Sequence, residues 1–446
     1  MSPKTSNATH MDNQVSEPNQ LANVPLLLQP SYARSKSLLY DELRNFRISL
    51  KWCALDHSSR IGKFISYLTF VFLSIVVPLL GCFSIKVQSS AEADDPISFN
   101  KWVQFPESGL ALLGFFTLSR FFSKYGLRQL LFLDGLQDDS LFVRRGYTRE
   151  LDKSFRYLAC ILLPSFFVEL AHKIIFFSTV KVTLPYIGSG VPLNSIVFVL
   201  VLSSWVYRTG VFLLVCVLFR LTCELQILRF EGFHKMFEGC ESDAGVIFRE
   251  HVRIRKQLSA TSHRYRFFII ASLVVITVSQ LGALILVLAT KSDKSFFNSG
   301  DLVVCSAVEL SGFFLCLLGA ARITHRAQGI ASIATRWHMT VTCASSGSDQ
   351  WKEQTECRDS DSDSSDIFIT VSSQDQSSFQ TRQALVAYLQ HNNGGITLFG
   401  FALDRGLLHT IFAFEFSLVL WILSKCSTDY STFYNSNVQM TPWPNG

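Results

Sequence analysis

Seven stretches of predominantly apolar residues alternate along the chain with segments that carry most of the charge. Each stretch holds about 20 residues or more, enough for a helix to cross the roughly 30 Å hydrocarbon core of a bilayer. A segment in lipid must pair its own peptide groups, so we expect each stretch to be helical. The stretches cover residues 64–85, 103–122, 155–180, 193–218, 267–289, 302–323 and 396–423. The pattern predicts an all-α, polytopic membrane protein with seven transmembrane helices.

The composition agrees with a lipid bilayer as the main partner of this chain. Hydrophobic residues make up 48% of the sequence and charged residues 17%, an apolar excess that average soluble domains do not show. The formal net charge is +5, but Lys and Arg stand beside the apolar stretches and not on one compact face. This placement is typical of topology signals and argues against nucleic acid as a partner.

The basic residues also predict how the chain is oriented. Segments 34–63, 124–153 and 229–266 each carry at least six Lys or Arg, whereas Lys181 is the only basic residue between the third and fourth stretches. Basic residues close to span ends are retained in the cytosol. The tail after Cys426 has neither Lys nor Arg. We therefore expect a cytosolic N-terminus and an external C-terminus.

The remaining segments divide the chain into six regions. Helical patterns continue past the fourth span and precede the fifth, so we expect the bundle to extend into the cytosol. The Ser/Asp-rich loop is interpreted either as a solvated linker or as a regulatory loop that accepts phosphate. The regions are a disordered N-terminus (1–36), an amphipathic pre-membrane segment (37–63), helices one to six (64–343), the disordered loop (344–380), the last, pore-type helix (381–426) and an external tail (427–446).

Several ionisable residues fall inside the predicted spans, where each costs at least about 2.5 kcal/mol and so needs a reason. Glu169, His172 and Lys173 occupy one face of the third span at spacings of three and four residues. They either form a self-satisfied pair or contribute to a pocket. Tyr207 and Arg208 lie near the middle of the fourth span, and Glu309 lies in the outer part of the sixth. We expect these residues to border a pocket that opens outward.

The last span contains one carboxylate in an apolar stripe. Glu415 has Ile411 and Val419 one helical turn away on either side. This pattern is expected of a helix that lines a pore with a hydrophobic constriction, and four copies would form an acidic ring that favours cations. The alternative is a Glu bonded to a neighbouring helix. The last helix also has glycines at 394–400, where we expect a break.

Catalysis and metal binding are not indicated by any motif. The 11 cysteines include no CxxC pair, and most lie in or beside apolar helices, as packing residues do. The sequence has no Gly-rich phosphate loop followed by Lys, no HExxH and no GxSxG. We expect neither an enzyme nor a bound metal or cofactor.

Two segments carry a resemblance to a known family. DELRNFRISLKWCALDHSS (41–59) and GGITLFGFALDRGLLHTIFAFEFSLVLWIL (394–423) resemble plant seven-span proteins described as gustatory-receptor-like. Those proteins are distantly similar to insect gustatory and odorant receptors, which are tetrameric, ligand-gated cation channels with cytosolic N-termini. The insect motif in the last span is Thr-Tyr, five apolar residues and Gln-Phe. When this chain is aligned on Phe416, Glu415 takes the place of the Gln.

The resemblance implies that the last helix lines a central pore and that cytosolic helix extensions hold the subunits together. The leading hypothesis is a homotetrameric, ligand-gated cation channel of the plasma membrane, opened by an unknown small molecule. Its pore would be lined by Ile411, Glu415 and Val419, and Glu169, His172, Lys173, Tyr207 and Arg208 would border the ligand pocket. The alternatives are a small-solute transporter and a non-conducting scaffold or signalling protein. A G-protein-coupled receptor would need the opposite orientation.

Overall fold

The structure is a computed structural model of the chain, and its described residues belong to one compact unit, residues 50–446. The description covers residues 60–84, 97–124, 136, 139–179, 193–238, 243–289, 296–356, 373–392 and 394–439. The predicted disordered N-terminus, nearly all of the amphipathic segment 37–63 and the quoted segment 41–59 lie outside these residues. The prediction of an all-α protein is confirmed for the part described.

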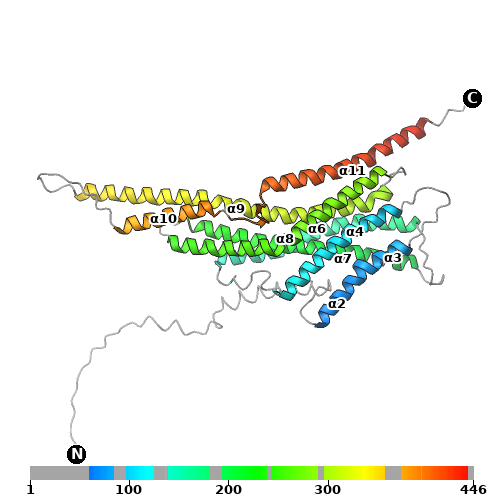
Figure 1. Cartoon of the computed structure of the whole chain (residues 1–446), viewed down its shortest axis with the longest axis horizontal. Helices are drawn as coiled ribbons and strands as arrows, with labels where there is room; N and C mark the ends of the chain where they lie inside the picture. The colour runs from blue at the N-terminus through cyan, green and yellow to red at the C-terminus, as the bar shows by residue number, and fades with distance from the viewer. Residues whose placement is uncertain are drawn as a thin grey trace, which may run out of the picture. The chain divides into compact units, whose positions relative to one another are not determined.

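The helices follow the predicted spans closely (Figure 1). The first span is one continuous helix. It carries three labels because its middle segment, η2, is π-helical. The elements are α2 Arg60–Val71, η2 Phe72–Val76, α3 Val77–Ser84, α4 Ile97–Lys124, α6 Leu141–Thr179, α7 Leu193–Lys235, α8 Ala244–Ala289, α9 Phe296–Glu356, α10 Ser373–His391, β1 Thr397–Leu398, β2 Phe401–Ala402 and α11 Arg405–Gln439.

Five helices in the described part are long and apolar enough to cross a membrane: α2 to α3, α6, α7, α8 and α9. The chain is therefore an integral membrane protein. α4 and α11, at the second and seventh predicted spans, do not meet that combined criterion of length and composition. The number of crossings and their direction stay predictions.

Helix α7 is the centre of the bundle. Within its most apolar window, 94% of the residues are buried, compared with 17% in α6 and 33% in α8. A helix that is apolar all round is buried on every side, and α7 packs against α3, α4, α6, α8 and α9. The apolar faces of α6 and α8 are instead left on the outside, where lipid replaces protein.

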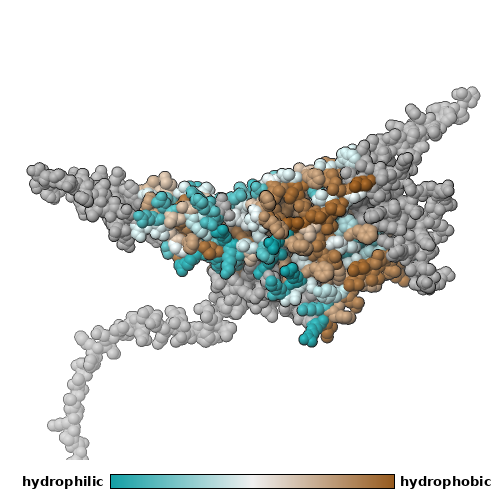
Figure 2. Space-filling view, in the orientation of Figure 1, coloured by the Kyte–Doolittle hydropathy of each residue, from teal (hydrophilic) through white to brown (hydrophobic). Residues whose placement is uncertain are grey.

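Hydrophobic and hydrophilic surfaces separate along the bundle. Figure 2 shows hydrophobic residues gathered over α2, α4 and the adjoining parts of α8 and α11, and hydrophilic residues gathered toward α10. Exposed residues of the first group include Phe64, Leu68, Phe116 and Val278. α7, α8 and α9 run well past their apolar stretches, and α10 packs on α8 and α9. The predicted polar extension of the bundle is thus present.

The last span differs from the prediction at its start. The chain forms a β1–β2 hairpin in place of a helix from residue 396, with Thr397 opposite Ala402, and α11 begins at Arg405. Gly400 has a φ of 93°, which glycine adopts without strain. Asp404 caps α11 by accepting from the Leu407 N–H at 2.8 Å. The break expected at the glycines is therefore confirmed. It is a hairpin that leaves α10 and α11 as separate helices, and not a kink within one helix.

Two predicted boundaries also need correction. The loop 344–380 is helical at both ends, because α9 continues to Glu356 and α10 begins at Ser373; residues 357–372 lie outside the described residues. The tail 427–446 is helical as far as Gln439. α9 contains no proline, and the tail has none before Pro442, so no residue removes a helical hydrogen bond earlier.

Candidate functional site

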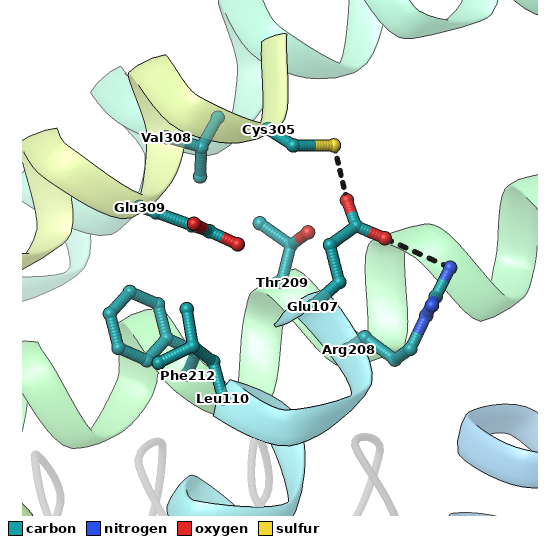
Figure 3. Close-up of a pocket in the computed structure, with 8 residues that line it drawn as sticks. All are labelled: Glu107, Leu110, Arg208, Thr209, Phe212, Cys305, Val308 and Glu309. Carbon is teal, nitrogen blue, oxygen red and sulfur yellow. Dashed lines mark hydrogen bonds and ion pairs between the residues drawn. The ribbon is translucent and has the colours of Figure 1, made fainter. Parts of the chain in front are cut away.

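A pocket lies between α4, α7 and α9 in the part of the bundle that the predicted spans form. Figure 3 shows the eight side chains that line it: Glu107, Leu110, Arg208, Thr209, Phe212, Cys305, Val308 and Glu309. The space among them is about 260 Å³, its opening included. The cavity itself is only about 10 Å³, room for about one water molecule, so a larger ligand would have to widen it.

One side of the pocket is held by a buried ion pair. Arg208 Nη2 lies 3.0 Å from Glu107 Oε2, and both side chains are less than a tenth exposed. Arg208 Nη1 also donates to Ser108 Oγ at 3.1 Å and to the Gln104 carbonyl at 3.3 Å, which fixes the guanidinium against α4. Cys305 of α9 donates to Glu107 Oε1. α4, α7 and α9 are thereby joined by polar contacts at one level.

The opposite side of the pocket is formed by Glu309 and apolar groups. Figure 3 shows the Glu309 carboxylate directed from α9 toward Thr209 of α7. Glu309 is 7% exposed, and no hydrogen bond or ion pair joins it to another described residue. Leu110, Phe212 and Val308 supply apolar surface beside it. The site thus combines charge with an apolar wall, as small-molecule pockets do.

The sequence prediction brought together residues that the structure divides between two places. Arg208 and Glu309 meet in the pocket, as expected. Glu169 and Lys173 are buried on α6 with their charged atoms 3.3 Å apart, close to the self-satisfied pair that the sequence left open. His172 is buried beside them, and Tyr207 is half-buried on α7. None of these four lines the pocket, and a role for them in ligand binding stays a prediction.

Sequence reasoning missed Glu107 and Cys305. Glu107 stands directly after Pro106 near the start of the second span and is the only acidic residue between positions 103 and 122. An acidic residue in one span and Arg208 in another are candidates for pairing, because each is costly alone in lipid. That signal was available in the sequence. Cys305 gives no such signal, because a cysteine in an apolar helix resembles any packing residue.

The predicted pore stripe lies on the inner face of α11 in the single chain. Glu415 is 1% exposed, and its carboxylate accepts a hydrogen bond from the Thr277 hydroxyl of α8. Ile411 and Val419 are half-buried on the same face. The other face of α11 exposes Phe414 and Phe416 and also a row of small residues. The sequence alone could not decide which face packs on the bundle.

No group of three or more His, Cys, Asp or Glu side chains that could hold a metal ion occurs within the described ranges. A second buried cluster lies in the polar extension. Asp139, before α6, accepts from Arg229 of α7 at 2.7 and 2.9 Å and from Arg253 of α8 at 2.5 Å. Arg229 also donates to Gln257 of α8. This cluster joins three segments of the extension, which suits a structural role.

The fold is similar to that of an insect receptor. The olfactory receptor OR5 of Machilis hrabei in complex with eugenol matches with a TM-score of 0.52 and 12% identity over 82% of this chain and 91% of the receptor. A second structure of that receptor matches with a TM-score of 0.50 and the same identity over 82% and 90% of the two chains. At this identity, the likeness is one of fold.

No curated protein matches the chain at a significant level. A family model described as "Protein of unknown function (DUF3537)" matches residues 41–414. This match covers most of the chain, including every helix from α2 to α10 and the start of α11. The chain therefore belongs to the DUF3537 family of proteins of unknown function.

Proposed function

We propose that the chain is a subunit of a ligand-gated cation channel. The fold similarity to a receptor that binds a small molecule, eugenol, supports this proposal. A ligand would have to widen the α4–α7–α9 pocket to bind there, and would favour the open pore by binding the open state more tightly than the closed one. Several copies of α11 would line the pore around a common axis. The finer features of the proposal are a homotetramer, the plasma membrane, and kinship with plant gustatory-receptor-like proteins.

The observation that carries the proposal is the composition of the exposed face of α11. Positions spaced by three and four residues on this face form what we call the small-residue row. Its small members, all exposed in the single chain, are Gly406, Thr410, Ala413, Ser417 and Ser424, and Leu420 is a large side chain at the remaining position. Small side chains allow helices to approach one another around an axis, and hydroxyls can line an aqueous path. Large apolar residues flank the row, including Phe414 and Trp421.

The stripe of Ile411, Glu415 and Val419 is the competing candidate for the pore surface. In the single chain the Glu415 carboxylate accepts a hydrogen bond from Thr277 of α8. If Glu415 faced a pore instead, α11 would have to separate from α8 and this hydrogen bond would be lost. The small-residue row needs no such change. We therefore favour the row as the pore surface of the resting channel, and the Glu415–Thr277 hydrogen bond as a contact that holds α11 to α8.

Cysteine substitution on α11 separates the two faces. Thr410→Cys and Ser417→Cys test the row, and Ile411→Cys and Val419→Cys are matched controls on the same helix. The background carries Ser at Cys160 and Cys343, the exposed cysteines of the described chain. We expect a cationic thiol reagent to block whole-cell cation current in the first pair and not in the second. Block of only the second pair would assign the pore to the Glu415 stripe.

A transporter is the main alternative, and the same cells distinguish it. A channel produces unitary currents, whereas a transporter moves solute at a rate that saturates and shows no unitary conductance. Saturable uptake that is unaffected by reagents at either stripe of α11 would favour the transporter. In that case the buried charges of the pocket would form the substrate site.

A further inference from the structure

The tip of the β1–β2 hairpin exposes two aromatic rings. Phe399 is 68% exposed and Phe401 is 76% exposed, one on each side of Gly400. The base of the hairpin is fixed elsewhere, by Ser262 of α8 and Thr324 of α9, whose hydroxyls each accept from a backbone N–H of the hairpin segment at 3.2 Å. The two rings therefore contribute little to holding the hairpin on the bundle.

Phe399 also occupies a position that disfavours a bulky side chain. Its φ of 49° and the φ of 93° at Gly400 are both positive, as the type I′ turn of a two-residue hairpin loop requires. That turn favours Asn, Asp or Gly at its first central position, and a bulky residue with positive φ is strained. Strain kept for the sake of an exposed side chain is typical of a functional site. A contact outside the chain would account for the ring.

The hairpin tip lies at the level where the apolar stretch of α8 begins. The Arg266 guanidinium of α8 is 5.1 Å from the centroid of the Phe399 ring. The next residue, Phe267, is 70% exposed, and Val274 and Val278 continue the same exposed face along α8. Figure 2 shows the hydrophobic surface of the bundle giving way to hydrophilic residues toward α10. The exposed rings therefore continue the lipid-facing surface of α8 at its polar end.

Positive charge accompanies the rings. Arg266 is half-buried, and Arg405, the first residue of α11, is exposed. Within the described ranges, no hydrogen bond or ion pair joins either guanidinium to another residue. Asp404, the acidic residue beside them in sequence, caps α11 by accepting from the Leu407 N–H. A guanidinium that lies over a ring keeps its N–H donors at its edge, where they can bind two oxygens of a phosphate.

We propose that the hairpin tip binds an anionic phospholipid of the membrane leaflet beside the polar extension. Arg266 binds the headgroup phosphate, Arg405 adds positive charge, and Phe399 and Phe401 lie among the upper parts of the acyl chains. Continuity with the lipid-facing surface of α8 and the positive charge favour a lipid over a second copy of the chain. The site is independent of the α4–α7–α9 pocket and of ion conduction. Because the hairpin directly precedes α11, a bound lipid fixes where this helix enters the membrane.

Native mass spectrometry of the purified full chain measures bound lipid and oligomeric mass together. The protein in detergent is titrated with phosphatidic acid and with phosphatidylcholine of the same acyl chains, and the wild type should prefer phosphatidic acid. In Arg266→Gln, we expect the first phosphatidic acid to bind about fivefold more weakly, the effect of one basic residue near an anionic surface. Arg249→Gln is the matched control, because Arg249 is exposed on the same helix about 25 Å further into the polar extension. It should bind both lipids as the wild type does.

Phe399→Asn tests the ring in a variant that should fold well, because asparagine tolerates a positive φ at this turn position. We expect a melting temperature equal to or above that of the wild type, together with a several-fold loss of phosphatidic acid binding. Glycerol 3-phosphate carries the phosphate without acyl chains. At equal concentration it should not displace the lipid, because it leaves both rings uncovered.

Four results would overturn the inference. Phosphatidic acid binding that is unchanged in Arg266→Gln, or weakened equally in Arg249→Gln, would show that no specific site exists at the tip. A smaller oligomeric mass of Phe399→Asn with unchanged lipid binding would show that a second copy of the chain covers the rings. Displacement by glycerol 3-phosphate would assign the arginines to a soluble phosphate. Phe399→Asn decides the matter even if Arg266→Gln fails to fold.

Discussion

Asp139 is a single residue that joins three segments of the polar extension through ion pairs. Its carboxylate is 1% exposed and receives Arg229 and Arg253. Asp139→Asn removes the negative charge, so the buried Arg229 keeps only Gln257, which is uncharged, and Arg253 keeps Glu250. We expect it to destabilise the fold by roughly 3–5 kcal/mol, because removing one partner of a buried ion pair leaves an uncompensated charge. The measurement is the melting temperature of the detergent-solubilised protein.

Asp152→Asn is the matched control for this prediction. Asp152 also pairs with an arginine, Arg156, at 2.7 Å, but both side chains are about 70% exposed. Exposed pairs contribute 0 to about 1 kcal/mol, so this variant should melt close to the wild type. Equal melting temperatures for Asp139→Asn and Asp152→Asn would show that the buried cluster does not hold the extension together.

His251 makes the stability of the extension depend on pH. It lies on α8 before residue 267, where the apolar stretch begins, and its ring packs near Phe233 and Tyr388. Burial, and secondly the charge of Arg255, lowers its pKa from 6.5 to about 4. Below pH 6.5 His251 becomes protonated in the unfolded chain, whereas in the folded chain it stays neutral until the pH approaches 4. Stability is therefore complete above pH 6.5 and falls as the pH drops toward 4.

Replacing the ring isolates this effect. Between pH 7.5 and 5, the free energy of unfolding should fall by about 1–2 kcal/mol less in His251→Phe than in the wild type, because phenylalanine does not take up a proton. His263→Gln, an exposed histidine on the same helix, should keep the wild-type pH dependence. Melting curves at the two pH values measure both. An identical pH response in all three proteins would refute the assignment to His251.

At the scale of the elements, α7 and α9 approach closely at a glycine. A Cβ on Gly312 would lie 2.6 Å from Leu213 Cδ2 and 3.1 Å from Phe212 Cε1. Gly312→Ala should therefore cost roughly 1–3 kcal/mol by overpacking. Gly329→Ala, on the same helix but with nothing within 4 Å, should stabilise by up to about 1 kcal/mol. Melting temperatures of the two variants measure this difference.

The helices could be predicted because lipid leaves the backbone few choices. Apolar stretches of sufficient length had to become helices, and α7, α8 and α9 continue into the extension as the pattern indicated. The β1–β2 hairpin could be located only as a break at glycines, because its shape depends on Ser262 and Thr324. These hydroxyls accept from the N–H groups of Thr397 and Ile396, and a single sequence does not reveal such contacts between distant segments.

The candidate site was predictable only in part. Arg208 and Glu309 stood out as charges in apolar helices, and the structure places both in one pocket. Glu415 stood out in the same way, but a helix has several faces. The sequence could not show that its carboxylate accepts a hydrogen bond from Thr277 of α8 in the single chain, and a place for Glu415 in a pore stays a prediction. Periodicity gives the spacing of side chains on a helix, whereas the face that packs depends on the neighbouring helices.

At the scale of the whole molecule, the sidedness of the chain is the next prediction. Basic residues of the polar extension, such as Arg253 and Arg255, favour the cytosol. An epitope tag at residue 1 should therefore be reached by antibody only after the cells are permeabilised, and a tag after residue 446 in intact cells. A tag at residue 1 that is accessible from outside would reverse the orientation and would revive a G-protein-coupled receptor as a candidate.

The measurement that tests the channel proposal most directly is electrical recording from planar bilayers that contain the purified full chain. We predict discrete unitary currents whose reversal potential follows the cation gradient. Incorporated, folded protein that carries only saturable flux, with no unitary currents, would contradict the account.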